Sequence, residues 1–237
     1  MNIVAIIPAR GGSKRLHGKN IKRLNGRPLI SYTIDAALKC DSIVRVICST
    51  DNEEIAEIAQ NEGAEVPFLR PEYLSTDITK TPPVIEHAVS YIEIQEGKKV
   101  DVVVTLQPTS PLRESSHIEQ SLKQFFKGKY DSLVSVRKGY PPWWMLKVEK
   151  GRAKPLLNLE SSVNPFNLSR QQLPSAYEIN GAIYITDRRF LQNNSSVISI
   201  ENCGVFLMDQ ESSLDLDTMT DFLIIEEILK SKILNKE

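Results

Sequence analysis

Four cations and three glycines lie close together near the start of the chain, in the segment RGGSKRLHGKN at residues 10–20. The cations are Arg10, Lys14, Arg15 and Lys19. Glycine backbone N–H groups can converge on an anion, and guanidinium and ammonium groups neutralise a polyphosphate. Because the segment follows the apolar run NIVAIIP, we predict a phosphate-binding loop at the end of a first β-strand. A solvated basic turn is the alternative.

The spacing of this loop excludes the two commonest phosphate motifs. A Walker A loop has the pattern GxxxxGK[ST], whereas five residues separate Gly12 from Gly18 here, and Asn20 stands where a hydroxyl residue would hold magnesium. Gly11 and Gly12 are adjacent, and no third glycine completes the dinucleotide pattern GxGxxG. A magnesium ligand would therefore have to lie elsewhere in the chain.

A pair of carboxylates near the end of the chain offers such a ligand set. Asp215 and Asp217 stand two residues apart in SLDLDT, and on an extended segment residues i and i+2 project from the same face. Two neighbouring carboxylates repel each other unless a cation lies near them, and their hard oxygens suit Mg²⁺. Two exposed aspartates in a turn are the alternative.

Polar residues also follow the strongest predicted strand, VDVVVTLQP. Gln107, Thr109, Ser110 and Arg113 belong to the segment LQPTSPLR at its end. Open α/β sheets bind ligands at the carboxyl ends of their strands, so we expect these side chains at a ligand site. A rigid strand-to-helix connection would explain the same prolines.

These residues lie in a chain whose short apolar runs alternate with helix-period segments. The alternation predicts an α/β fold, a Rossmann-like mainly parallel sheet flanked by helices, in a single domain over residues 1–237. One predicted helix spans DNEEIAEIAQNEG, with Asp51 as its N-cap and Gly63 at its end.

Residues 138–177 break this alternation. The segment is rich in proline and holds both tryptophans, Trp143 and Trp144. We predict an inserted dimerisation arm, because aromatic residues are enriched at interfaces. A surface excursion pinned by two aromatic side chains is the alternative.

Composition limits the remaining possibilities. A net charge of −1 over 237 residues argues against a broad nucleic-acid surface. Three dispersed cysteines fit a reducing, cytoplasmic location. No secretory signal is recognised at the N-terminus, and no apolar run approaches the roughly 20 residues of a membrane span.

The segment IIPARGGSKRLHGKN resembles the N-terminal signature of the sugar-activating cytidylyltransferases. It is most similar to that of the CMP-sialic acid synthetases (N-acylneuraminate cytidylyltransferases) and their legionaminate and pseudaminate relatives. The resemblance recurs in order at RPEYLSTD, LQPTSPLR, RQQLP, NGAIYITD and SLDLDT. It implies that CTP and an acidic nine-carbon 2-keto sugar give a CMP-sugar and pyrophosphate. It further implies Mg²⁺ as cofactor, and a homodimer whose arm reaches the partner's sugar site.

The resemblance also implies roles for individual residues. Arg10, Lys19 and Asp215 would be catalytic, with Asp215 also a hypothetical base, and Asp215 and Asp217 would hold the metal. The nucleotide would be bound by Arg10, Gly11, Gly12, Ser13, Lys19, Asn20, Arg70, Asp77 and Thr81. The sugar would be bound by Gln107, Thr109, Ser110, Arg170, Asn180 and Tyr184, with Lys147 as a second candidate for its carboxylate.

Two departures from the family pattern concern the sugar end. Glu178 stands where some sialic acid enzymes carry an arginine, and residues 197–199 replace an aromatic pair. A CMP-legionaminate or CMP-pseudaminate synthetase is therefore an alternative, and an enzyme for an eight-carbon octulosonate is another. From other functional classes, a nucleotide-sensing protein on the same fold would be expected to lose Lys19 or the acidic pair, and a nucleic-acid-binding module would need a wider basic face.

Overall fold

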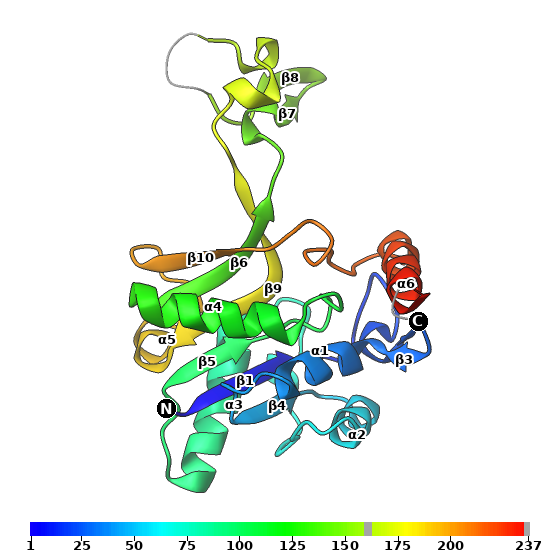
Figure 1. The fold of residues 1–237 in the computed structure, drawn as a ribbon, viewed down its shortest axis with the longest axis vertical. Helices are drawn as coiled ribbons and strands as arrows, with labels where there is room; N and C mark the ends of the chain where they lie inside the picture. The colour runs from blue at the N-terminus through cyan, green and yellow to red at the C-terminus, as the bar shows by residue number, and fades with distance from the viewer. Residues whose placement is uncertain (159–162, 235–237) are drawn as a thin grey trace.

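A six-stranded sheet forms the centre of the computed structural model, which describes residues 1–158 and 163–234 (Figure 1). The strand order is β10-β6-β9-β5-β1-β4. Strand β9 runs antiparallel to both of its neighbours, while the other pairings in the sheet are parallel. The mainly parallel sheet is thus confirmed. Its strands are β1 (Ile3–Pro8), β4 (Arg45–Ser49), β5 (Val102–Thr105), β6 (Ser132–Lys138), β9 (Tyr177–Asp187) and β10 (Cys203–Leu207).

Helices cover both faces of this sheet, as the apolar runs predicted. Alternate residues of β1 enter different cores: Ile7 packs with one cluster and Ile6 with the other. The first cluster includes residues of α1 (Leu29–Leu38), α2 (Glu53–Asn61) and α4 (Ser115–Gly128). The second includes residues of α3 (Thr81–Glu96) and α5 (Arg188–Asn194).

A third apolar cluster joins the two ends of the chain. Helix α6 (Met219–Leu234) packs beside the short hairpin of β2 (Arg23–Leu24) and β3 (Arg27–Pro28), as Figure 1 shows. Leu24, Leu216 and Phe222 are buried there, and Leu16 of the basic loop packs against them. This cluster holds the segment with Asp215 and Asp217 close to the opening loop. No helix among the described residues is long and apolar enough to cross a membrane.

The start of α2 differs from the prediction. Asn52, not Asp51, is the N-cap: its side chain accepts a hydrogen bond from the backbone N–H of Ile55. Both residue types cap helices well, so the sequence pair Asp-Asn did not decide between them. The carboxylate of Asp51 instead accepts from the backbone N–H of Gly11.

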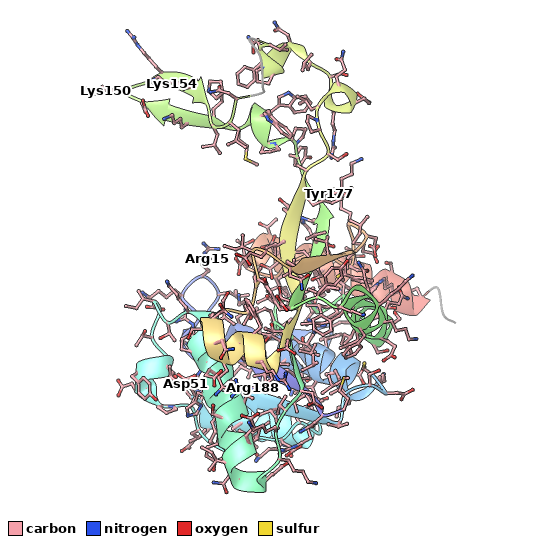
Figure 2. All side chains as sticks on the ribbon, turned by 90° about the vertical axis from the view of Figure 1, so that its left-hand side faces the viewer. Arg15, Asp51, Lys150, Lys154, Tyr177 and Arg188 are labelled. Carbon is pink, nitrogen blue, oxygen red and sulfur yellow. The ribbon has the colours of Figure 1, made fainter. Side chains whose placement is uncertain are left out.

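The proline-rich segment leaves the sheet between paired residues Lys138 and Tyr177 and projects away from the body (Figures 1 and 2). It carries a hairpin of β7 (Leu146–Glu149) and β8 (Arg152–Pro155), with Lys150 at its outer turn in Figure 2. It also contains three short 3-10 helices, η3 (Pro142–Trp144), η4 (Pro165–Asn167) and η5 (Arg170–Gln172). The indole N–H of Trp144 donates to the carbonyl of Pro165 at 3.1 Å. Residues 159–162 of the predicted arm lie outside the described residues.

A partly buried charge cluster around Arg188 joins α5 to α3 at the edge of the sheet away from the basic loop. The guanidinium of Arg188 pairs with Glu86 at 2.8 Å and with Glu93 at 2.9 Å, and its side chain is 8% exposed. Removing one member of such a cluster leaves the others without compensation.

We therefore expect Arg188→Met to lower the free energy of unfolding by about 3 kcal/mol, because two carboxylates lose their partner. Urea unfolding measures this change. Arg189→Met is the matched control on the exposed side of the same helix and should change stability by less than about 0.5 kcal/mol. Equal effects of the two substitutions would contradict a stabilising role for the cluster.

Candidate active site

The predicted functional segments meet at one edge of the sheet. The basic loop follows β1, Asp51 follows β4, the turn with Gln107 follows β5, and Asp217 follows β10 along the chain. Parallel strands bring these carboxyl ends together. A cavity of about 500 Å³ lies there. Six cations and two carboxylates line it: Arg10, Lys14, Arg15, Lys19, Arg70 and Lys80 against Asp77 and Asp217.

The basic loop is held by contacts to its own backbone and to α2. The side-chain amide of Asn20 donates to the carbonyl of Arg10 at 2.9 Å, which joins the two ends of the loop. Gly11 packs so closely on Asn52 that an added Cβ would lie 3.0 Å from the Cβ of that residue. At Gly12 an added Cβ would meet nothing within 4 Å. Gly11 therefore fits against the protein, whereas Gly12 borders open space, and Ser13 lines the cavity.

Two aspartates that line the cavity neutralise part of the loop's charge. Asp77 pairs with Arg10 at 2.8 Å and also with Lys14. Hydrogen bonds from Lys14 and then Arg10 lower the pKa of Asp77. Asp217 pairs with Lys19 at 2.9 Å and with Arg15 at 2.7 Å. Both carboxylates occupy positions where the loop can hold other anionic oxygens.

Arg70 supplies a buried cation at the far end of the cavity. Its side chain is 4% exposed, and its Nε donates to the hydroxyl of Ser75 at 3.2 Å. Its Nη2 lies 3.6 Å from Asp51 and has no hydrogen-bond partner among the described residues. Burial lowers the pKa of Arg70. Thr81, the first residue of α3, lines the same cavity. This region thus presents a buried cation beside the start of a helix.

The acidic pair has the donor chemistry that a magnesium ion requires. Leu216 is buried and donates its backbone N–H to the carbonyl of Thr109 at 2.8 Å, so that Asp215 and Asp217 flank it. Desolvation by the surrounding protein raises the pKa of Asp215, although the residue keeps access to solvent. A hydrogen bond from Thr109 opposes this shift, and the charge of Asp217 adds to it. A divalent cation would relieve that repulsion. No group of three or more His, Cys, Asp or Glu side chains suited to a metal occurs in the described part of the chain.

Some of the residues predicted for the sugar lie at the cavity, and others are buried. Gln107 and Thr109 line the cavity, and half-buried Tyr184 lies close enough to Asp215 for that charge to add to the effect of burial in raising the pKa of the tyrosine. The hydroxyl of Ser110 is buried without a hydrogen-bond partner among the described residues. Asn180 is also buried, and its side chain is bonded to Ser135 and Ser213.

Arg170 does not line the cavity of its own chain. It lies at the arm, where it donates to the carbonyl of Gly139 at 3.1 Å and sits 5.3 Å from the centre of the Tyr140 ring. A separate hollow of about 520 Å³ at the base of the arm includes Arg170 and Lys138. The predicted sugar carboxylate ligand is therefore remote from Gln107 within one chain.

One supporting residue was not among the predicted site residues, and another was expected at this edge of the sheet without a role of its own. Asp51 was assigned to a helix cap, although its place after a strand could have pointed to the site. Arg113 belongs to the quoted motif LQPTSPLR, and its Nη1 donates to the carbonyls of Gln107 at 3.1 Å and Ala182 at 2.9 Å. Burial lowers the pKa of Arg113 to about 9. Arg113 thus joins the turn after β5 to β9.

Comparison with known proteins gives relatives along the whole chain. "Post-translational flagellin modification protein B" of Campylobacter coli is 34% identical over 232 residues, which cover 97% of this chain and 96% of that protein. "CMP-N,N'-diacetyllegionaminic acid synthase" of Legionella pneumophila is 36% identical over 244 residues, with 100% and 99% coverage. "N-acylneuraminate cytidylyltransferase" of Escherichia coli O18:K1:H7 is 35% identical over 235 residues, which cover 97% of this chain but 52% of that protein.

The fold has a counterpart among solved structures. The structure of a CMP:2-keto-3-deoxy-manno-octonic acid synthetase complexed with CTP superposes with a TM-score of 0.71 at 19% identity, covering 98% of this chain and 100% of the other. At that identity the likeness concerns the fold alone, and it confirms the predicted fold class. The model of the cytidylyltransferase family, finally, matches residues 4–228, and this chain belongs to that family of nucleotidyltransferases.

Proposed function

We propose that this protein transfers CMP from CTP to a nine-carbon 2-keto acid sugar and releases pyrophosphate. The observation that carries the proposal is the single cavity at the carboxyl edge of the sheet. It combines a cationic loop, a buried arginine with an unused donor, and the polar turn after β5. Its excess of positive charge complements a nucleoside triphosphate. The names of the relatives support a nonulosonic acid as the acceptor.

In the proposed reaction, the 2-hydroxyl of the sugar attacks the α-phosphorus of CTP. The new oxygen–phosphorus bond forms as the bond to the β-phosphate oxygen breaks, and the hydroxyl proton passes to a base, for which Asp215 is the candidate. Lys19 and Arg10 stabilise the negative charge on the phosphates, since both already hold carboxylate oxygens in the cavity. Gly11, Gly12, Ser13 and Asn20 shape the loop so that the reacting atoms are aligned.

Cytosine is assigned to the end of the cavity with Arg70. Cytosine presents O2 and N3 as acceptors and its amino group as a donor, and the guanidinium of Arg70, a residue that lines the cavity, supplies donors. A backbone carbonyl near Thr81 would accept from the amino group. Asp77 would keep Arg10 in place before the triphosphate arrives.

We assign a magnesium ion to Asp215 and Asp217, whose paired carboxylates suit it. When bound, Mg²⁺ supplies positive charge that offsets the charge of the phosphates. Release of Asp217 from Lys19 and Arg15 would free both cations for the triphosphate and the carboxylate for the metal.

The sugar would lie against Gln107, Thr109, Ser110 and Tyr184, with Asn180 supporting β9 beside it. Because Arg170 is remote from the cavity of its own chain, we propose a homodimer in which Arg170 of the partner subunit reaches the sugar carboxylate. Arginine suits this role because its guanidinium can bind a carboxylate through two hydrogen bonds. The free thiols Cys40, Cys48 and Cys203 fit the proposed cytoplasmic location.

The identity of the acceptor decides between the closest alternatives. We expect pyrophosphate release when the protein is mixed with CTP, Mg²⁺ and sialic, legionaminic or pseudaminic acid. An eight-carbon octulosonic acid should react at least about tenfold more slowly, because it lacks the ninth carbon and the acylamino groups that a nonulosonate site would contact. A coupled pyrophosphate assay with all four acids measures this. Release with the octulosonate alone would contradict the nine-carbon assignment, and release with none would contradict the enzyme proposal.

The acidic pair is tested by Asp215→Ala. We expect kcat to fall by about 100-fold or more even at saturating Mg²⁺, because a ligand and the candidate base are both lost. Steady-state kinetics over a range of Mg²⁺ concentrations measures the change. Asp35→Ala, which removes an exposed carboxylate on α1, is the control and should leave kcat unchanged. Near-normal turnover of Asp215→Ala would rule out both of its proposed roles.

The partner's contribution is tested by mixing inactive variants. If Arg170 acts in the partner's cavity, one site takes Lys19 from one chain and Arg170 from the other. Lys19→Ala and Arg170→Ala then remove residues that different chains contribute to that site. Random mixed dimers should then regain roughly a quarter of the normal activity, because half of the dimers are mixed and each has one intact site. Co-expression followed by a pyrophosphate assay measures this recovery.

Lys19→Ala mixed with Asp215→Ala is the matched control for this experiment. Lys19 lines the cavity, and Asp215 of the same chain lies close enough for the charge of Lys19 to oppose the rise in its pKa. Every site in a mixed dimer therefore keeps one defect, and no activity should return. Recovery in the control, or its absence in the first mixture, would contradict the proposed arrangement.

A further inference from the structure

We infer that Asp51 is a positioning residue that holds the phosphate-binding loop and the base-reading arginine in a fixed relation to each other. This inference rests on the proposed function, since it concerns the two ends of the nucleotide cavity. Asp51 itself is not among the residues that line that cavity. Its effect would therefore pass through Gly11 and Arg70.

The backbone already places Asp51 between these two elements. On one side, the N–H of Ala9 donates to the carbonyl of Ser49 at 2.9 Å. On the other side, the N–H of Arg70 donates to the carbonyl of Thr50 at 2.7 Å. The strand end with Ser49 and Thr50 thus has the start of the basic loop on one flank and Arg70 on the other. Asp51 is the next residue along this strand end.

The side chain of Asp51 extends the same connection into the site. One carboxylate oxygen, Oδ1, accepts the N–H of Gly11 at 2.9 Å and lies 3.6 Å from Nη2 of Arg70. A single oxygen therefore contacts both the loop proposed to hold the phosphates and the guanidinium proposed to read the base. The carboxylate is 26% exposed and the arginine side chain 4%, so water screens this contact less than it would a surface pair.

Neighbouring groups leave little freedom on either side of Asp51. Gly11 packs closely on the start of α2, because an added atom at its Cβ position would lie 3.1 Å from Nδ2 of Asn52. Arg70 is repelled by Arg10, whose charge lowers the pKa of Arg70, whereas the charge of Asp51 raises it. Asp51 is thus the anion that compensates Arg70, and its loss would favour rotation of the guanidinium away from the base.

Because Asn52 caps α2, Asp51 can be changed without removing the helix cap. Asp51→Asn keeps an oxygen that can accept from Gly11 but removes the charge beside Arg70. Asp51→Ala removes both. The two substitutions therefore separate the base end of the cavity from its phosphate end.

The experiment measures binding of cytidine, inorganic tripolyphosphate and CTP by calorimetry, without any sugar. We expect Asp51→Asn to weaken cytidine binding about tenfold, because the proposed hydrogen bond from the guanidinium of Arg70 to the base is lost. Tripolyphosphate binding should stay within about twofold, because the contact of residue 51 with Gly11 is kept. Asp51→Ala should weaken both fragments, and CTP by about 100-fold. In kinetics, Asp51→Asn should raise KM for CTP and keep kcat within about threefold.

Ile55→Ala is the control for a purely structural effect. Ile55 is a buried residue of α2 outside the cavity, so its truncation lowers stability without touching Gly11 or Arg70. It should lower Tm and leave all three dissociation constants within about twofold. Loss of fragment binding in Ile55→Ala to the same degree as in Asp51→Ala would overturn the inference, because destabilisation alone would then explain the loss.

The outcomes also separate this inference from the proposed function. Unchanged cytidine binding in Asp51→Asn, together with unchanged tripolyphosphate binding in Asp51→Ala, would overturn the role of Asp51 alone. If the unaltered protein binds CTP but releases no pyrophosphate with any acid sugar, the proposed reaction fails while the binding data still decide the role of Asp51. Absence of CTP binding by the unaltered protein would overturn both.

Discussion

Mutual repulsion among cations is the constraint on which the rest of this site depends. Six positive side chains line one cavity of about 500 Å³ at the edge of the sheet. Such a set is stable only where anions lie between its members. Asp77, Asp217 and Asp51 provide them, and each comes from a different segment of the chain. The fold can be understood as the means by which three distant carboxylates reach one loop.

The same arrangement prepares the site for its proposed substrate. Carboxylates that hold Arg10 and Lys19 keep these side chains extended into the cavity, so less side-chain entropy is lost when a triphosphate takes their place. Exchange of one anion for another also avoids the cost of exposing unpaired cations. Arg70 differs, because its unused donor is buried and already oriented. The cavity thus combines an exchangeable end for phosphate with a fixed end for the base.

The sequence predicted those parts of the fold and site that depend on local patterns. Apolar runs such as NIVAIIP located the strands, and the glycine and lysine spacing located the loop. Strand direction is not encoded in an apolar run, so the reversal of β9 in the middle of the sheet was not predicted. The role of Asp51 was also missed, because Asp-Asn before a helix suits a cap at either residue. What distinguishes Asp51 from Asn52 is the hydrogen bond that Asp51 accepts from Gly11, which lies 40 residues earlier in the chain.

Sequence motifs likewise could not place the sugar residues relative to one another. Arg170 and Gln107 belong to motifs of equal clarity, yet one lies on the arm and the other in the cavity. Asn180 of β9 is a polar residue in a motif, but its side chain is hydrogen-bonded to Ser135 of β6 and to Ser213 in the segment after β10. Tertiary packing, not residue type, decides which polar group stays available.

Strand β9 has a mechanical consequence. Its first residue, Tyr177, pairs with Lys138 at the base of the arm, its middle passes Asn180 and Tyr184, and its last, Asp187, precedes Arg188. A load applied along the arm would act on β6 and β9 together, parallel to the strands. The hydrogen bonds to β5 and β10 would then resist in shear, all at once, and would not open one after another. The base of the arm is therefore anchored in the sheet through both of its strands, so a pull along the arm would load the sheet before it could detach the arm.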